Sequence, residues 1–260
     1  MASRAVVAVL GVVLLAAAAA PAAFTLDPPP ASRTLAALAP KPSVVSAEQV
    51  VRTPTRRSVG RTTSGPFGAR LQRTVMLRDR PGGRILRAIG QRTEFGSQRV
   101  LAVVEQRPGW LAVLTHHVGN SRAAWIPANG AKLLFEPYTM HADLSQRTLV
   151  VRREGRVARR IRVAIGGPAT ATPTGRFAVT DALVIGRAGS PYGCCALALT
   201  GRQPNVAQGW TGGDRLAIHG TTNEATLGMP VSNGCLRAGA ADMRWLIDTV
   251  PLGSPLRISA

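Results

Sequence analysis

The sequence predicts a mainly β protein in which a small barrel is followed by a larger β-sandwich or barrel with one helix. Three observations support this fold class: short apolar runs recur along the chain after residue 73, Gly and Pro signals separate them, and one segment near the C-terminus has helical periodicity. A chain of 260 residues is also long enough for two domains that each bury a core.

The N-terminus has the pattern of an export signal. Arg4 is followed by an unbroken apolar run, Ala5–Ala20, and then by small residues suited to cleavage near Ala22 or Ala23. This run is shorter than the ~20 residues that cross a bilayer comfortably. We expect residues 1–23 to be a signal peptide or an N-terminal anchor that contacts the membrane, and the sequence leaves cleavage open. The protein is then expected to be exported to the cell wall or periplasmic space, either secreted or membrane-tethered.

Residues 24–72 have the composition of a flexible linker. They are rich in Pro, Ser, Thr, Ala and Arg, and they show no sustained helical or strand period. Such a segment cannot build a core. We expect it to let the folded part of the chain reach away from the membrane.

Residues 73–130 contain five strand-like runs with turn sequences such as RPGG and GNSR between them, which predicts a small barrel. The order of features, with PGWLAV around Trp110, a hairpin, and then WIP at Trp125, resembles bacterial SH3-like domains. His116 and His117 fall in this hairpin. We expect them to be exposed turn residues and not metal ligands, because adjacent strand residues point to opposite faces.

Residues 138–260 predict a second β-rich domain. Two strands are expected on either side of a turn at Glu154 and Gly155, several short strands follow, and SPLRIS forms the last strand. The helical pattern belongs to AGAADMRWLIDTV, which ends before Pro251.

The formal charge of +19 comes almost entirely from arginine, since Lys41 and Lys132 are the only lysines. A polyanionic partner therefore has to be considered, although arginines scattered among many alanines could equally reflect coding bias. No basic helical stripe or aromatic RNA-binding motif accompanies the charge. We expect no nucleic-acid partner, keep anionic cell-wall polymers as a candidate, and leave the oligomeric state open.

The chain contains three cysteines, an odd number for an exported protein. Cys194 and Cys195 are adjacent, and they could be small apolar fillers of a strand, a vicinal disulfide, or a redox partner for Cys235. The sequence does not decide between these alternatives. A metal site is not expected, because Cys194, Cys195 and His219 lack the usual spacing of zinc ligands.

Cys235 lies in PVSNGCLRAG, a setting of small and polar residues that suits a reactive thiol better than a buried structural one. A nucleophilic cysteine needs a neighbour that takes its proton, and His219, sixteen residues earlier at the end of an apolar strand, is the candidate. Gly234 gives the backbone freedom to present amides to an oxyanion. Arg237 places a fork-shaped cation suited to a carboxylate near the thiol.

The arrangement of IHG followed by SNGCLR resembles the active site of L,D-transpeptidases of the YkuD type. Supporting matches cover most of residues 138–260: DLSQRTLVV resembles the family's first strand, TPTGRF its hairpin, PYG a following loop and GSPLRI its last strand. The resemblance implies an L,D-transpeptidase-type β domain that acts on peptidoglycan stem peptides. Its cysteine would form a thioester, expel D-alanine and pass the acyl group to an amine of a neighbouring stem, giving a 3→3 cross-link.

The same resemblance implies roles for individual residues. Cys235 would be the nucleophile and His219 the general base and later the acid, while the amides of Gly234 and Cys235 would face the oxyanion. The donor-peptide pocket would be shaped by Ser232, Asn233, Arg237 and Tyr192. The resemblance implies that carbapenems acylate the cysteine, and we expect no cofactor.

One position departs from the family pattern. Many members have a second histidine where this chain has Asn233, and asparagine does not titrate near neutral pH, so catalysis would rest on His219 alone. A carbonyl near Gly220 or the hydroxyl of Thr221 would orient the imidazole. Three alternatives stay open: a carboxypeptidase using water, an acyltransferase that attaches a protein to peptidoglycan, and a non-enzymatic wall-binding protein.

Overall fold

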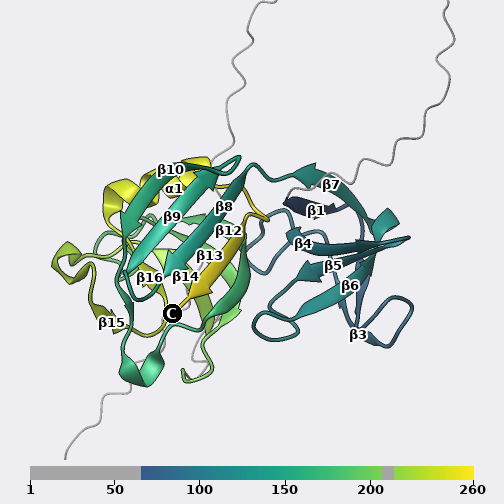
Figure 1. Cartoon of the computed structure of the whole chain (residues 1–260), viewed down its shortest axis with the longest axis horizontal. Helices are drawn as coiled ribbons and strands as arrows, with labels where there is room; N and C mark the ends of the chain where they lie inside the picture. The colour runs from purple at the N-terminus through teal and green to yellow at the C-terminus, as the bar shows by residue number, and fades with distance from the viewer. Residues whose placement is uncertain (1–65, 207–213) are drawn as a thin grey trace, which may run out of the picture. The chain divides into compact units, whose positions relative to one another are not determined.

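The computed structural model describes residues 66–206 and 214–260, and these residues form two large antiparallel or mixed sheets and one α-helix (Figure 1). The mainly β fold expected from the sequence is confirmed. Residues 1–23 and most of the expected linker lie outside the described residues. Within the described part of the chain, no helix is long and apolar enough to cross a membrane.

The first sheet has seven strands in the order β3-β2-β6-β5-β4-β1-β7, and all its pairs are antiparallel. The strands are β1 Phe67–Leu71, β2 Val75–Arg78, β3 Ile85–Ile89, β4 Val100–Arg107, β5 Trp110–Leu114, β6 Ala123–Pro127 and β7 Ala131–Phe135. A short 3-10 helix, Ala128–Gly130, joins the last two strands. The five expected runs correspond to β2 through β6.

Two boundaries expected from the sequence are wrong. The linker expected through residue 72 ends earlier, because β1 pairs with β4 and β7 and buries Ala69 and Leu71 completely. The sheet also continues past residue 130 through β7. Each strand is only five residues long, FGARL and AKLLF, and neither has a regular alternation of apolar and polar residues, so the sequence pattern alone does not mark them as strands. The resemblance of this part to SH3-like domains stays a prediction.

The second sheet has eight strands in the order β10-β9-β8-β17-β12-β13-β14-β16. The strands are β8 Tyr138–Asp143, β9 Thr148–Arg153, β10 Arg156–Arg162, β12 Gly175–Val184, β13 Cys195–Arg202, β14 Arg215–His219, β16 Leu236–Arg237 and β17 Pro255–Ser259. Strands β11 Ile165–Gly166 and β15 Pro230–Ser232 form a separate parallel pair. The remaining helices are the 3-10 helices Pro168–Thr170 and Glu224–Thr226 and the α-helix α1, Ala240–Thr249.

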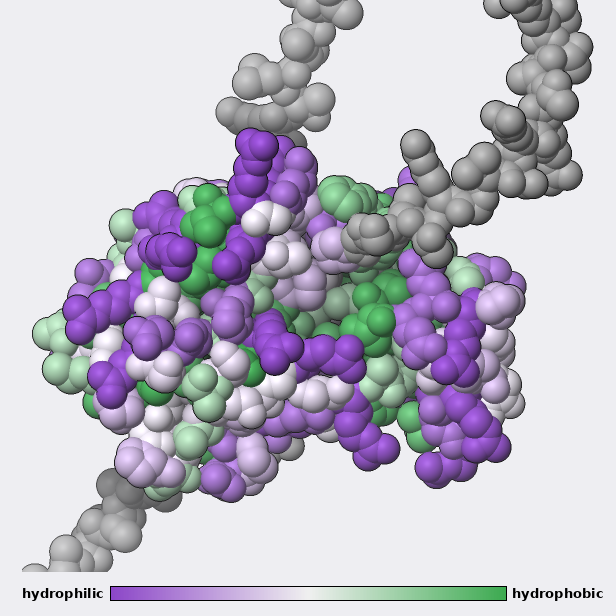
Figure 2. Space-filling model, in the orientation of Figure 1, coloured by the Kyte–Doolittle hydropathy of each residue, from purple (hydrophilic) through white to green (hydrophobic). Residues whose placement is uncertain are grey.

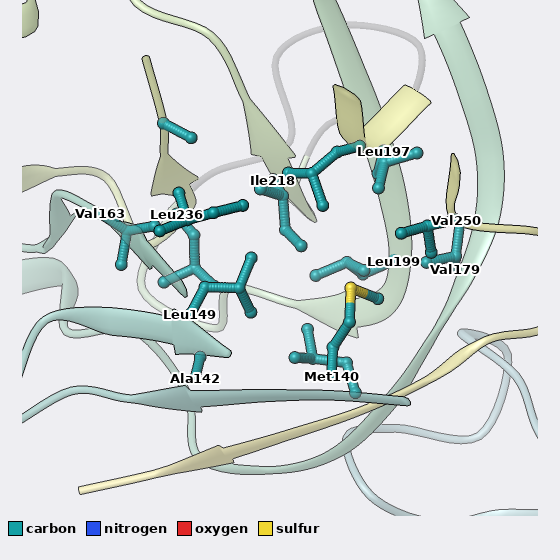
Figure 3. Close-up of a cluster of buried hydrophobic side chains, with 14 of the residues drawn as sticks. Met140, Ala142, Leu149, Val163, Val179, Leu197, Leu199, Ile218, Leu236 and Val250 are labelled. Carbon is teal, nitrogen blue, oxygen red and sulfur yellow. The ribbon is translucent and has the colours of Figure 1, made fainter. Parts of the chain in front are cut away.

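The core of this sheet lies between its two halves, because the sheet curls back on itself. Figure 3 shows Met140 and Leu149 from β8 and β9 pointing toward Leu197 and Ile218 from β13 and β14. Helix α1 packs on β13 and β12 and adds Met243 and Leu246 to the same core.

The expected turn between β9 and β10 is present, with Glu154 and Gly155 both at positive φ. On the face of the protein in Figure 2, hydrophilic residues cover much of the described surface in separate groups with hydrophobic residues between them. Five of the arginines gather in one cleft, which is described below.

Candidate active site

A parallel pair of strands places the two candidate catalytic residues on the same face of the sheet. Strand β16 pairs with β14 so that Leu236 lies opposite Ile218 and Arg237 lies opposite His219. Leu236 and Ile218 both point into the core. Because side chains alternate along a strand, His219 and Arg237 lie on the other face of the sheet, and Cys235 enters β16 on that face as well.

His219 is held in one tautomer by its own strand end. The imidazole is 4% exposed, and its Nδ1 lies 2.6 Å from the carbonyl oxygen of Gly220. A carbonyl can only accept, so Nδ1 carries the proton and Nε2 keeps a free lone pair. Burial lowers the pKa of His219 to about 4, opposed by the Gly220 hydrogen bond and assisted by the charge of Arg237. The imidazole is therefore neutral at ordinary pH and able to accept a proton.

Of the two orienting groups expected from the sequence, the Gly220 carbonyl is the one in place. The Thr221 hydroxyl instead hydrogen-bonds within its own turn, with Asn223. Tyr192 packs edge-on against the imidazole, with ring centroids 4.9 Å apart. Gly193 follows it at positive φ, and a side chain there would come within 2.8 Å of the Gly220 backbone. This close approach keeps Tyr192 against the histidine.

Cys235 is a free thiol that is partly accessible. Its Sγ donates toward the Arg215 carbonyl at 4.0 Å. Burial raises the pKa of Cys235, while a main-chain hydrogen bond from Ala217 and the charge of Arg237 oppose the increase. The resting site thus pairs a protonated thiol with a neutral imidazole, and the thiolate has to be formed by proton transfer.

The turn before the nucleophile is organised by Ser232. Its hydroxyl donates to the Cys235 carbonyl at 2.6 Å and accepts from the Gly234 amide at 3.1 Å. In this arrangement the Gly234 N–H donates to the Ser232 hydroxyl, so the expected role of this amide as an oxyanion donor stays a prediction. The Cys235 N–H has no acceptor among the described residues and is the available donor.

Gln203 is part of the site although no sequence motif indicated it. Its buried amide donates to the carbonyls of Thr170 and Ala171, both at 3.0 Å. The same amide packs against Gly234, whose φ is 111° and whose position leaves no room for a Cβ. Thr170 in turn donates to the Ser232 carbonyl at 3.1 Å. Gln203 therefore ties the loop at Pro168–Thr170 to the turn that carries the thiol.

Arg237 and Asn233 are the residues with unused polar groups. The Arg237 Nε is buried without a hydrogen-bond partner among the described residues, and its charge acts on Cys235, His219 and Tyr192. Asn233 is exposed, and its side chain makes no hydrogen bond within the described part of the chain. Both groups are positioned to bind a ligand that approaches the thiol.

Cys194 and Cys195 form a vicinal disulfide at the start of β13, one of the three alternatives left open by the sequence. The next residue, Ala196, lies opposite His219, and the Cys195 carbonyl accepts from the Gly220 amide at 3.1 Å. The disulfide thus lies in the strand that supports the histidine. Among the described residues, no group of three His, Cys, Asp or Glu side chains could hold a metal ion.

Comparison with known proteins relates the second sheet to one family. Residues 137–258 match the L,D-transpeptidase catalytic domain named YkuD. The YkuD proteins of Bacillus subtilis and Bacillus licheniformis are 30% and 29% identical to this chain over 123 residues, which is 47% of this chain and 66% of each relative. The match therefore spans slightly less than two thirds of the length of these relatives.

Similar solved structures include L,D-transpeptidase 3 from Mycobacterium tuberculosis with a faropenem-derived adduct, at 17% identity and a TM-score of 0.40. That likeness covers 53% of this chain and 73% of the other. An L,D-transpeptidase from Mycobacterium smegmatis has 20% identity and a TM-score of 0.39, covering 63% of this chain and 92% of the other.

Proposed function

We propose that the protein is a cysteine-dependent acyltransferase acting on peptidoglycan, because residues 137–258 match the YkuD family of L,D-transpeptidase catalytic domains. Its specific reaction is the formation of 3→3 cross-links between stem peptides. The observation that carries the proposal is the neutral His219, fixed by the Gly220 carbonyl on the same sheet face as the Cys235 thiol.

The first half-reaction begins with proton transfer from the Cys235 thiol to Nε2 of His219. The thiolate then attacks the carbonyl that precedes the terminal D-alanine of a tetrapeptide stem, and the carbonyl oxygen becomes an oxyanion. The Cys235 N–H donates to this oxyanion, with the Gly234 N–H joining if the turn releases it from Ser232. Collapse breaks the amide bond, the imidazolium returns its proton to the leaving amine, and a thioester remains.

The second half-reaction repeats these steps in reverse. A side-chain amine of a neighbouring stem gives its proton to His219 and attacks the thioester, and the Cys235 sulfur leaves as a thiol after taking the proton back. Attack by water instead would give a carboxypeptidase on the same site. The buried neutral histidine supports either outcome, so the acceptor decides between them.

Arg237 supports the choice of a peptide with a free carboxylate as donor. Its guanidinium lies within electrostatic reach of the thiol and has a buried Nε without a partner among the described residues. A fork-shaped cation suits a terminal carboxylate. Tyr192 and Asn233 would line the same pocket, with Ser232 shaping its floor through the turn.

The location follows from the substrate. We propose that residues 1–23 export the protein and that the acyltransferase acts at the cell wall. A role as a non-enzymatic wall-binding protein is the alternative of a different class. It is disfavoured because the thiol, the oriented imidazole and the glycine turn are all in place.

Intact-protein mass spectrometry tests the proposal. The full-length protein is incubated with a carbapenem and, separately, with a disaccharide-tetrapeptide, beside Cys235→Ala. We expect a covalent adduct that is absent in the variant, together with D-alanine release and cross-linked dimer. An adduct with only tripeptide monomer would favour the carboxypeptidase, and a folded protein that forms no adduct would favour wall binding.

A further inference from the structure

A cleft of about 510 Å³ beside the second sheet is lined by five arginines. The arginines are Arg87, Arg92, Arg99, Arg202 and Arg215. Arg87 lies in β3 of the first sheet, and Arg202 and Arg215 lie in β13 and β14 of the second. Arg92 and Arg99 lie in the connection between β3 and β4. No step of the proposed reaction uses them.

Main-chain carbonyls hold two of these arginines in fixed positions. Arg99 donates from Nε to Gly90 at 2.9 Å and from Nη2 to Arg92 at 2.7 Å, and it is only 8% exposed. The Arg215 side chain is 5% exposed and donates from Nε and Nη2 to Leu199, at 2.9 and 2.6 Å. The carbonyls that hold these guanidinium groups are neutral and do not cancel their charge. Arg215 is also paired with the Glu94 carboxylate, whereas Arg99 forms no ion pair within the described part of the chain, so its fixed charge is left to attract an anion.

The acidic groups around the cleft do not balance its cations. Glu94 pairs with Arg215 and Asp214 pairs with Arg202, and Asp181 bonds Thr93. Arg87 and Arg92 form no ion pair within the described part of the chain. One carboxylate, that of Glu94, already lies in the cleft. It pairs with Arg215, and its Oε1 is 3.6 Å from Nε2 of His116. The cleft therefore already accommodates one carboxylate. Its arginines without an ion pair could bind further carboxylates.

His116 and His117 line the same cleft. Contrary to the expectation of exposed turn residues, His116 is buried, because the hairpin that carries it packs against Arg202 and Arg215 of the second sheet. Burial lowers the pKa of His116 to about 2, and the charge of Arg215 lowers it further. The pKa of His117 falls to about 4 through burial and the charge of Arg87. The two neutral rings can donate hydrogen bonds without adding charge.

The cleft lies on the face of the sheet that carries the nucleophile. Along β14, Leu216 and Ile218 point into the core, so Arg215, Ala217 and His219 share the opposite face. The Arg215 carbonyl is also the group to which the Cys235 thiol donates. Arg215 therefore connects the cleft to the reacting centre within one strand.

We propose that this arginine cleft binds carboxylates of the substrate peptide. These carboxylates would belong to the part of the peptide that lies away from the bond being cleaved. The inference rests on the proposed function, since it takes the peptide bound at Cys235 as the occupant. A phosphate-bearing wall polymer is the competing ligand. The peptide is favoured because the cleft continues the sheet face beside the thiol, where a substrate already bound at Cys235 reaches it without a second encounter.

Calorimetric binding tests the inference without any turnover. Full-length protein carrying Cys235→Ala is titrated with a stem tetrapeptide that has free internal carboxylates, with the same peptide carrying amides in their place, and with a glycerol-phosphate oligomer. The binding variant is Arg87→Gln/Arg92→Gln, which changes two exposed side chains. The matched control, Arg156→Gln/Arg244→Gln, removes two exposed arginines outside the cleft.

We expect the free-carboxylate peptide to bind about tenfold more tightly than the amidated one, as one charge-assisted hydrogen bond would give. The cleft variant should lose this preference, and the control should keep it. Equal binding of both peptides, or a preference that survives in the cleft variant, overturns the inference. So does a phosphate oligomer that binds more tightly than the peptide and loses affinity in the cleft variant. Adduct formation at Cys235 tests the proposed function separately, so either idea can fail alone.

Discussion

Replacing Gly234 by alanine should disable the nucleophile without altering the thiol itself. The residue has a φ of 111°, which L side chains rarely adopt. A Cβ there would overlap the Nε2 of Gln203 and come within 3.1 Å of its Cδ. Gln203 is buried and holds two carbonyls, so its amide cannot swing away without breaking both hydrogen bonds.

The cost follows from these contacts. Placing alanine at this φ costs about 1–2 kcal/mol. Losing the two Gln203 hydrogen bonds adds about 1 kcal/mol each. The total is about 3–4 kcal/mol if the turn stays in place. A turn that moves instead displaces the thiol, and a shift of ~1 Å can lower a reaction rate by about 100-fold.

Two measurements check this reasoning: the free energy of unfolding in urea and the rate of carbapenem acylation. Gly155→Ala is the matched control, because Gly155 also has positive φ, at 82°, but no atom within 4 Å of its Cβ position. Gln203→Ala and the double variant complete a cycle that isolates the clash. A Gly234→Ala protein that loses no more stability than Gly155→Ala and acylates within about twofold of the parent would refute the argument.

Three further predictions concern titration and redox state. The acid limb of acylation should have an apparent pKa near 4, because His219 must be neutral to accept the thiol proton; rates measured against pH check this, and a limb near 6.5 would contradict it. Burial raises the pKa of Glu136 from 4.5 to about 7, so the stability that its neutral form contributes is complete below about 4.5 and is lost as pH rises through about 7. Glu136→Gln should therefore gain up to about 3 kcal/mol over the parent at pH ~8 and little at pH ~4, as urea unfolding at both values would show. Alkylation of denatured, unreduced protein should label one cysteine per chain, and three after reduction, because Cys194 and Cys195 are paired; three labels before reduction would rule the disulfide out.

The sequence could identify the chemistry of the site because its parts are local. A thiol after a glycine and a histidine at a strand end are recognisable from neighbouring residues, and the Gly220 carbonyl was one of two orienting groups expected beside His219. Gln203 could not be found in this way. It acts through loops more than thirty residues distant in both directions, and glutamine at a strand end has no pattern of its own.

The same limit explains the errors in the first sheet. His116 was expected to be exposed because hairpins usually are, but its burial depends on Arg202 and Arg215, which lie about a hundred residues later. Strand β1 is only five residues long and follows a segment with linker composition, so its pairing with β4 and β7 on either side defines it. Contacts between distant segments decide these features, and a single sequence does not display them.

The pairing of β14 with β16 has a consequence for how this site can change. The ladder sets the position of the thiol relative to the imidazole, while the segment between them is fixed at points of its own: Glu224 accepts from the Ala240 amide, and Gly228 bonds Val163. Insertions at the exposed Thr222, before these points, should then be tolerated as long as the ladder and the Ser232 turn persist. That position is a natural place to graft new sequence, and substrate preference could be redesigned there while the reacting atoms keep their geometry.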